Sequence, residues 1–227
     1  MVGFGQALGE LLPSAVGVAL SPIPIIAVVL MLMSPNAGRT APALALGWVA
    51  GLAAATAVVV LVADPAGAAR EGARPVVGWI KVVLGLLFLV LAAGQWRKRP
   101  RPGEAPELPG WMAAIDRMSF GKALGLGAVL SAANPKNLTL AVAAALAVAQ
   151  AGLGGGGAAA AVAVFVVLGS LTVAGPVLVY LALRDRVRAP LLAAKDWLVR
   201  ENATVMFIVL LVLGVVIIGK GITSITA

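Results

Sequence analysis

The sequence predicts an all-α integral membrane protein with six transmembrane helices. Three observations lead to this fold class: 61% of the 227 residues are hydrophobic, only 11% are charged, and the mean hydropathy is +1.05. These values lie far outside the range of soluble domains. No series of alternating ten-residue segments predicts a β-barrel. Because the apolar segments use nearly all of the chain, we expect a single membrane domain over residues 1–227.

The six helices are predicted from the length of the apolar segments. A transmembrane helix needs about 20 predominantly apolar residues, and six segments of the chain meet this requirement. The expected spans are residues 10–33, 41–63, 76–96, 121–148, 158–183 and 203–222.

Basic residues are concentrated in alternate connections between these spans. Twelve arginines and lysines fall in the first, third and fifth connections, whereas the second holds only Arg70 and Arg74 and the fourth holds none. Basic loops remain in the cytoplasm. We therefore expect these three connections inside the cell and both termini outside the cytoplasm, in a multi-pass protein of the inner (plasma) membrane.

This orientation divides the chain into two inverted three-helix repeats. Repeat 1 covers about residues 1–96, a cytoplasmic linker covers about 97–120, and repeat 2 covers about 121–227. Each repeat begins with a span that proline interrupts, at residues 21–24 (Ser-Pro-Ile-Pro) and 134–137 (Asn-Pro-Lys-Asn). Paired interruptions in corresponding positions of inverted halves are typical of a transporter binding site.

The two proline breaks hold the candidate binding site. Proline suits the first turn of a helix, so we expect Asn134 to cap a half-helix that begins at Pro135, and Ser21 to cap one that begins at Pro22. Each helix start presents backbone N–H groups and a partial positive charge, which favour an anion. Lys136 adds a full charge, and neither interrupted segment holds an acid. The pattern therefore predicts a site for a sulfate, phosphate or carboxylate group.

Structural interpretations compete with this functional one. Prolines in membrane helices often only kink them, and for the first break this reading is as good as the functional one. Lys136 lies too far from either end of its span to reach the interface easily, which favours a function. The expected substrate-binding residues are Lys136, Asn134, Pro135, Asn137, Ser21, Pro22, Pro24 and, as a weaker candidate, Trp48.

Several kinds of chemistry are disfavoured by composition. The chain has no cysteine and no histidine, which excludes disulfides and metal ligation by imidazole. Carboxylates are nearly absent from the spans, so a bare divalent cation has few of the hard oxygen ligands that it prefers. We predict no catalytic residue, no metal site, no cofactor and no nucleic-acid partner.

The motifs together resemble those of the lysine exporter (LysE) superfamily. The closer similarity is to its branch of sulfolipid-addressing or glycopeptidolipid-addressing proteins, the GAP family. The matching features are the first-span pattern at 19–28, the short loop at 34–39, the Gly-Trp pair at 47–48 and the Asn-Pro-Lys-Asn segment at 134–137. The resemblance implies six spans in two inverted halves, a homodimer, no enzyme activity, and export or translocation of envelope lipids in actinobacteria.

These observations predict a transporter that exports or flips an anionic envelope lipid or glycolipid, with the headgroup held where the broken helices meet. Two alternatives stay open. One is an exporter of a small solute such as an amino acid, whose carboxylate would use the same site. The other is a non-transporting scaffold of a lipid-export complex, which would act through its basic loops.

Overall fold

The computed structural model describes residues 2–62, 74–97, 99 and 110–226, and every regular element in these ranges is a helix. The predicted all-α class is therefore confirmed for the described residues. Most of the predicted linker, and Arg70, lie outside them. The α-helices are α1 (Val2–Ala19), α2 (Pro22–Met33), α3 (Ala37–Val62), α5 (Arg74–Arg97), α6 (Phe120–Ala132), α7 (Pro135–Gln150), α8 (Gly155–Leu183) and α9 (Arg188–Thr226), and the 3-10 helices are η2 (Gly110–Arg117) and η3 (Arg184–Val187).

Several of these helices can cross a membrane. Within the described residues, α3, α5, α8 and α9 are each long and apolar enough, and α1 with α2, which bend by 52° at the break between them, count as a fifth candidate if the pair is one span. The predicted span at 121–148 is divided between α6, with 13 residues, and α7, with 16 residues. The chain is therefore a multi-pass membrane protein.

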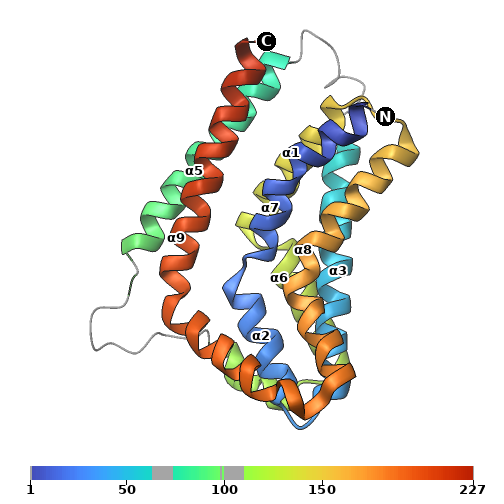
Figure 1. Ribbon diagram of the computed structural model, residues 1–227, viewed down its shortest axis with the longest axis vertical. Helices are drawn as coiled ribbons and strands as arrows, with labels where there is room; N and C mark the ends of the chain where they lie inside the picture. Colours follow the sequence, from blue (N-terminus) through green and yellow to red (C-terminus); the bar gives the residue numbers. More distant parts are fainter. Residues whose placement is uncertain (1, 63–73, 98, 100–109, 227) are drawn as a thin grey trace.

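Both expected proline breaks are present. Ser21 precedes α2 and Asn134 precedes α7, and both residues have an extended backbone. Asn134 Oδ1 accepts a hydrogen bond from the Lys136 N–H at 3.0 Å, as a capping residue should. Ser21 occupies the N-cap position but makes no capping bond with its side chain, so the expected serine cap is wrong in this detail. The two breaks lie at a similar height in the molecule (Figure 1).

The last helix is longer than the predicted span at 203–222. After Pro190 in its first turn, α9 contains no proline or glycine before Gly214, so no helix-breaking residue prevents the helix from beginning well before residue 203. Figure 1 shows that its first turns run across one end of the molecule before the helix turns to lie beside α5. Both termini lie at the opposite end.

The α5 and α9 helices form a close antiparallel pair (Figure 1). A Cβ atom at Gly85 would lie 2.7 Å from the Gly214 carbonyl oxygen, and one at Gly214 would lie 3.0 Å from the Gly85 carbonyl oxygen. Gly78 and Gly221 face each other in the same reciprocal way, at 2.8 Å. Small residues permit this approach, and close van der Waals packing is what associates helices in lipid.

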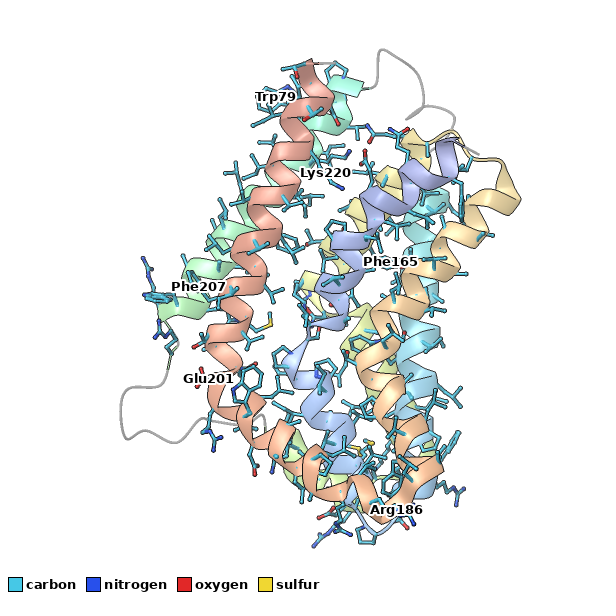
Figure 2. All side chains as sticks on the ribbon, viewed as in Figure 1. Trp79, Phe165, Arg186, Glu201, Phe207 and Lys220 are labelled. Carbon is cyan, nitrogen blue, oxygen red and sulfur yellow. The ribbon has the colours of Figure 1, made fainter. Side chains whose placement is uncertain are left out.

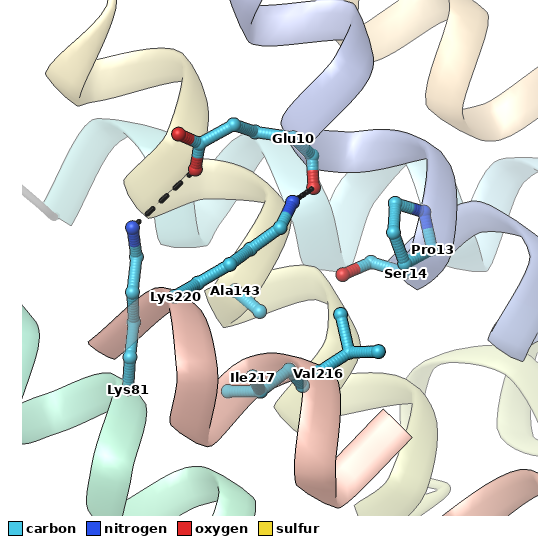
Figure 3. A pocket seen from close by; sticks show the side chains of 8 residues that line it. All are labelled: Glu10, Pro13, Ser14, Lys81, Ala143, Val216, Ile217 and Lys220. Atoms are coloured by element: carbon cyan, nitrogen blue, oxygen red, sulfur yellow. Dashed lines mark hydrogen bonds and ion pairs between the residues drawn. The ribbon is translucent and has the colours of Figure 1, made fainter. Parts of the chain in front are cut away.

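A polar cluster joins the α5–α9 pair to α1 and α7 (Figure 3). The Lys81 Nζ atom lies 2.6 Å from Gln150 Oε1, 3.4 Å from Glu10 Oε2 and 3.5 Å from Ser224 Oγ. Lys220 Nζ donates to the backbone oxygen of Glu10 at 2.9 Å. Lys81 is only 4% exposed. Its charge is therefore compensated by an acid and an amide on neighbouring helices, as a buried charge requires.

Substitution of Gly214 by leucine should loosen the α5–α9 pair. The new side chain would overlap the Gly85 carbonyl and the Leu89 side chain, and overpacking of this kind costs about 1–3 kcal/mol. Gly219→Leu is the matched control, because a Cβ atom there has no neighbour within 4 Å. Thermal unfolding of the purified protein in detergent should show a lower Tm for Gly214→Leu alone. Equal Tm values for the two variants would contradict the close glycine contact.

The Lys81 cluster makes a second prediction. Lys81→Met should destabilise the protein by about 1–3 kcal/mol, because it leaves the Gln150 oxygen and the Glu10 carboxylate without their donor. Glu10→Gln in the Lys81→Met background should cost less than the same change in the wild type, because the ion pair is already lost. The free energies of unfolding in a double-mutant cycle test this coupling. Strict additivity would show that the two side chains do not interact.

Candidate functional site

Lys136 lies in the first turn of α7 and reaches across to the end of α1. Its Nζ atom donates to the backbone oxygens of Gly17 at 2.7 Å and Leu20 at 3.2 Å, and to Ser21 Oγ at 2.7 Å. An ammonium group has three N–H donors, so all three are used. The carbonyl groups at a helix C-terminus lack partners within the helix and carry a partial negative charge. The lysine that the sequence leaves without an acid is therefore compensated by the end of a helix.

Asn137 performs a similar task at the other break. Its Nδ2 atom donates to the backbone oxygens of Leu130 and Ser131, each at 3.3 Å, and thereby caps the end of α6. Its Oδ1 atom is buried and has no hydrogen-bond partner among the described residues. Asn137 thus holds α6 and α7 together.

The starts of α2 and α7 present fewer N–H groups than an ordinary helix start. Pro22, Pro24 and Pro135 have no N–H to donate. The Ile25 N–H bonds to a carbonyl in the turn before it, and the Lys136 N–H bonds to the capping asparagine. The expected anion attraction of two helix starts is therefore reduced to the few donors that remain.

A cavity of about 250 Å³ lies where the two breaks face α5 and α9. The breaks contribute polar groups from Ser21, Asn134 and Lys136, and the facing helices contribute Gln95 from α5 and Asn202 from α9. All of the residues that line it belong to the described part of the chain, and none of them is acidic. The apolar part of the lining consists of Pro22, Ile23, Pro24, Leu91, Pro135, Met206 and Leu210.

Asn202 is, with Gln95, one of two polar lining residues that the sequence analysis did not place in the site. Its Oδ1 atom is buried and lacks a hydrogen-bond partner among the described residues, and a buried acceptor without a donor costs about 1–3 kcal/mol. A bound group with a hydroxyl or N–H donor would satisfy it. In the sequence, Asn202 follows Glu201 just before an apolar run, which indicates the end of a loop. Only the continuous α9 helix brings it to the cavity.

Two of the expected site residues lie elsewhere. Trp48 is 0% exposed and belongs to the apolar core around α3, where Gly47 places the backbone against the Leu124 carbonyl of α6. Asn137 is 1% exposed and engaged with α6. Neither residue lines the cavity. The other six expected residues do: Ser21, Pro22, Pro24, Asn134, Pro135 and Lys136.

The chain matches none of the curated proteins and none of the solved structures with which it was compared. A family model described as "Sap, sulfolipid-1-addressing protein" matches residues 11–223. The matched region begins within α1 and ends within α9, so it contains both breaks and every residue that lines the cavity. The chain therefore belongs to the Sap, sulfolipid-1-addressing protein family, whose description links this membrane protein to lipid export.

Proposed function

We propose that this protein exports or flips an anionic envelope lipid or glycolipid across the plasma membrane. The headgroup is held in the cavity between the two helix breaks. The observation that carries the proposal is the cavity itself, which combines a lysine, three amides and a hydroxyl with no acidic residue in its lining. Polar groups at this depth in a membrane protein mark substrate paths.

The chemistry of the cavity favours a headgroup with an anionic group and hydroxyl groups. Amide N–H groups of Gln95, Asn134 and Asn202 donate to sulfate, phosphate or sugar oxygens, and the buried Asn202 oxygen accepts from a sugar hydroxyl. Lys136 supplies positive charge at the wall without being free to move, since α1 holds it. The description of the family names a sulfolipid, a lipid class with this combination of groups.

The proposal includes six spans in two inverted halves. Three features support it. Each half begins with a helix broken at a proline, α1–α2 and α6–α7. The next helix of each half, α3 or α8, packs on the first part of the broken helix of the other half. The third helices, α5 and α9, pack on each other. In this arrangement α6 and α7 together form the fourth span.

The orientation follows from the basic residues. The α2–α3 junction, η2 and η3 lie at one end of the molecule, opposite both termini (Figure 1), and the exposed Arg186 of η3 is at that end (Figure 2). We place this end in the cytoplasm because basic loops stay inside. The protein acts as a homodimer and transports without catalysing a reaction.

The cavity amides provide the first test of this function. Gln95→Leu and Asn202→Leu remove donors and acceptors that bond to no other described residue, so the fold should be retained. Native mass spectrometry with a sulfoquinovosyl lipid or phosphatidylglycerol as probe should show about tenfold weaker retention for each variant, because a lost hydrogen bond costs about 1.5 kcal/mol. Gln6→Leu, on the exposed surface of α1, is the matched control and should bind as the wild type does.

The same experiment can reject the proposal. Equal lipid retention by the wild type, both cavity variants and the control would show that the headgroup does not bind in this cavity. Selective binding of a free amino acid without lipid would make the small-solute exporter the better function. Lys136 is unsuitable for this test, because its substitution also leaves the Gly17 and Leu20 carbonyls and the Ser21 hydroxyl without their donor.

The absence of cysteine makes the proposed orientation directly measurable. Single cysteines at Asn36, between α2 and α3, and at Gly154, between α7 and α8, lie at exposed positions. A membrane-impermeant maleimide added to intact cells should label Gly154→Cys. It should label Asn36→Cys only after the membrane is permeabilised. The opposite pattern would invert the proposed topology.

A further inference from the structure

A second, apolar concavity lies between α1 and α9. It has a volume of about 460 Å³, within the range of about 300–1,000 Å³ that is usual for ligand sites. Its lining runs from Gly9 on α1 to Leu20, which directly follows α1, and from Ile208 to Val216 on α9, and every residue in it is apolar. Gly9 leaves room at one end, because a Cβ atom there would meet nothing within 4 Å. We call this concavity the α1–α9 groove.

The groove adjoins the headgroup cavity at the break between α1 and α2. On one side, Leu20 ends the groove lining and Ser21 begins the cavity lining. On α9 the two linings overlap in sequence, with Met206 and Leu210 on the cavity and residues 208–216 on the groove, but they lie on different faces of the helix. The carbonyl of Leu20 itself bonds to Lys136 at 3.2 Å. The two concavities are therefore neighbours at the α1–α2 break, one polar at the helix breaks and the other apolar along α1 and α9.

The length of the groove matches one leaflet of a bilayer. The lining from Gly9 to Leu20 covers eleven residue steps, about 16 Å of helix. Half of the hydrocarbon core is about 15 Å thick. Val16 and Val212 are 51% and 53% exposed, so the groove is open along its side to the surrounding lipid. A flexible apolar chain attached to a polar group fits both this opening and the adjoining polar cavity.

We propose that the α1–α9 groove holds an acyl chain of the lipid whose headgroup occupies the central cavity. The proposal rests on the proposed function, and it names the substrate class as a lipid with an extended chain that enters sideways from the bilayer. The walls of the groove bind the chain by van der Waals contact, which also associates apolar groups within lipid, so a side chain that fills the groove weakens binding of a long-chain lipid. The groove directs the chain along α1 while the polar cavity selects the headgroup.

Filling the groove tests the proposal. Val212→Trp places a large ring in the groove, and Val215→Trp places the same ring on α9 at a position that is similarly exposed, at 59%, but does not line the groove. The probes are dipalmitoyl and dihexanoyl phosphatidylglycerol, which share one headgroup. Native mass spectrometry should show about tenfold weaker binding of the dipalmitoyl probe to Val212→Trp alone. Binding of the dihexanoyl probe should be the same for both variants and the wild type.

A second measurement uses the wild type and does not depend on the folding of a variant. A phosphatidylglycerol with a photoactivatable diazirine in the middle of its chain should crosslink to residues 9–20 and 208–216. Crosslinks confined to other exposed helix faces would overturn the groove assignment, as would equal behaviour of the two tryptophan variants. A change of oligomeric state in Val212→Trp with unchanged lipid binding would show that a second copy covers the groove, which also overturns it.

The two proposals fail in different ways. If the groove is empty but the headgroup is bound in the cavity, Gln95→Leu and Asn202→Leu weaken both probes and Val212→Trp weakens neither. If the headgroup is not bound in the cavity, the leucine variants bind both probes as the wild type does, whatever the tryptophan variants show.

Discussion

The bond between Lys136 and the end of α1 is the constraint on which the centre of this protein depends. A lysine buried among apolar helices needs acceptors for three N–H groups, and within a membrane only a helix end has free backbone carbonyls to offer. The break after Ala19 supplies them at Gly17 and Leu20. The second break places Lys136 in a first turn, opposite that end. The two breaks therefore depend on each other, because the first supplies carbonyl acceptors and the second places the lysine that donates to them.

The polar side chains at the breaks and those on the facing helices therefore have different roles in recognition. The first turn of α7 uses Lys136 and Asn137 to hold the ends of α1 and α6, so these side chains organise the breaks rather than reach freely toward a substrate. The polar groups that are available to a ligand come partly from the other side, from Gln95 and Asn202 on the α5–α9 pair. A headgroup in the cavity would thus bridge the two parts of the fold.

The α5–α9 pair is suited to be one wall of such a site. Its two reciprocal glycine contacts make it a close pair in its own right. It meets α1 at the Glu10–Lys81 cluster near the termini and meets α2 toward the opposite end. Between these attachments lie the α1–α9 groove and the cavity. Both concavities therefore lie along the contact region between the α5–α9 pair and the broken helices.

The sequence by itself determined the helical membrane class and both breaks, because hydropathy and proline act locally on the chain. Six of the eight expected site residues line the cavity for the same reason: they belong to the breaks themselves. The tertiary structure decided the partners of Lys136, the burial of Trp48 and the positions of Gln95 and Asn202 in the lining of the cavity. Each of these depends on which helices pack together and through which faces. Helices that are apolar on all sides have too little hydrophobic periodicity to specify these faces. Helix facing is set instead by close packing at glycines and by the pairing of a few buried polar groups, which involve residues far apart in the chain.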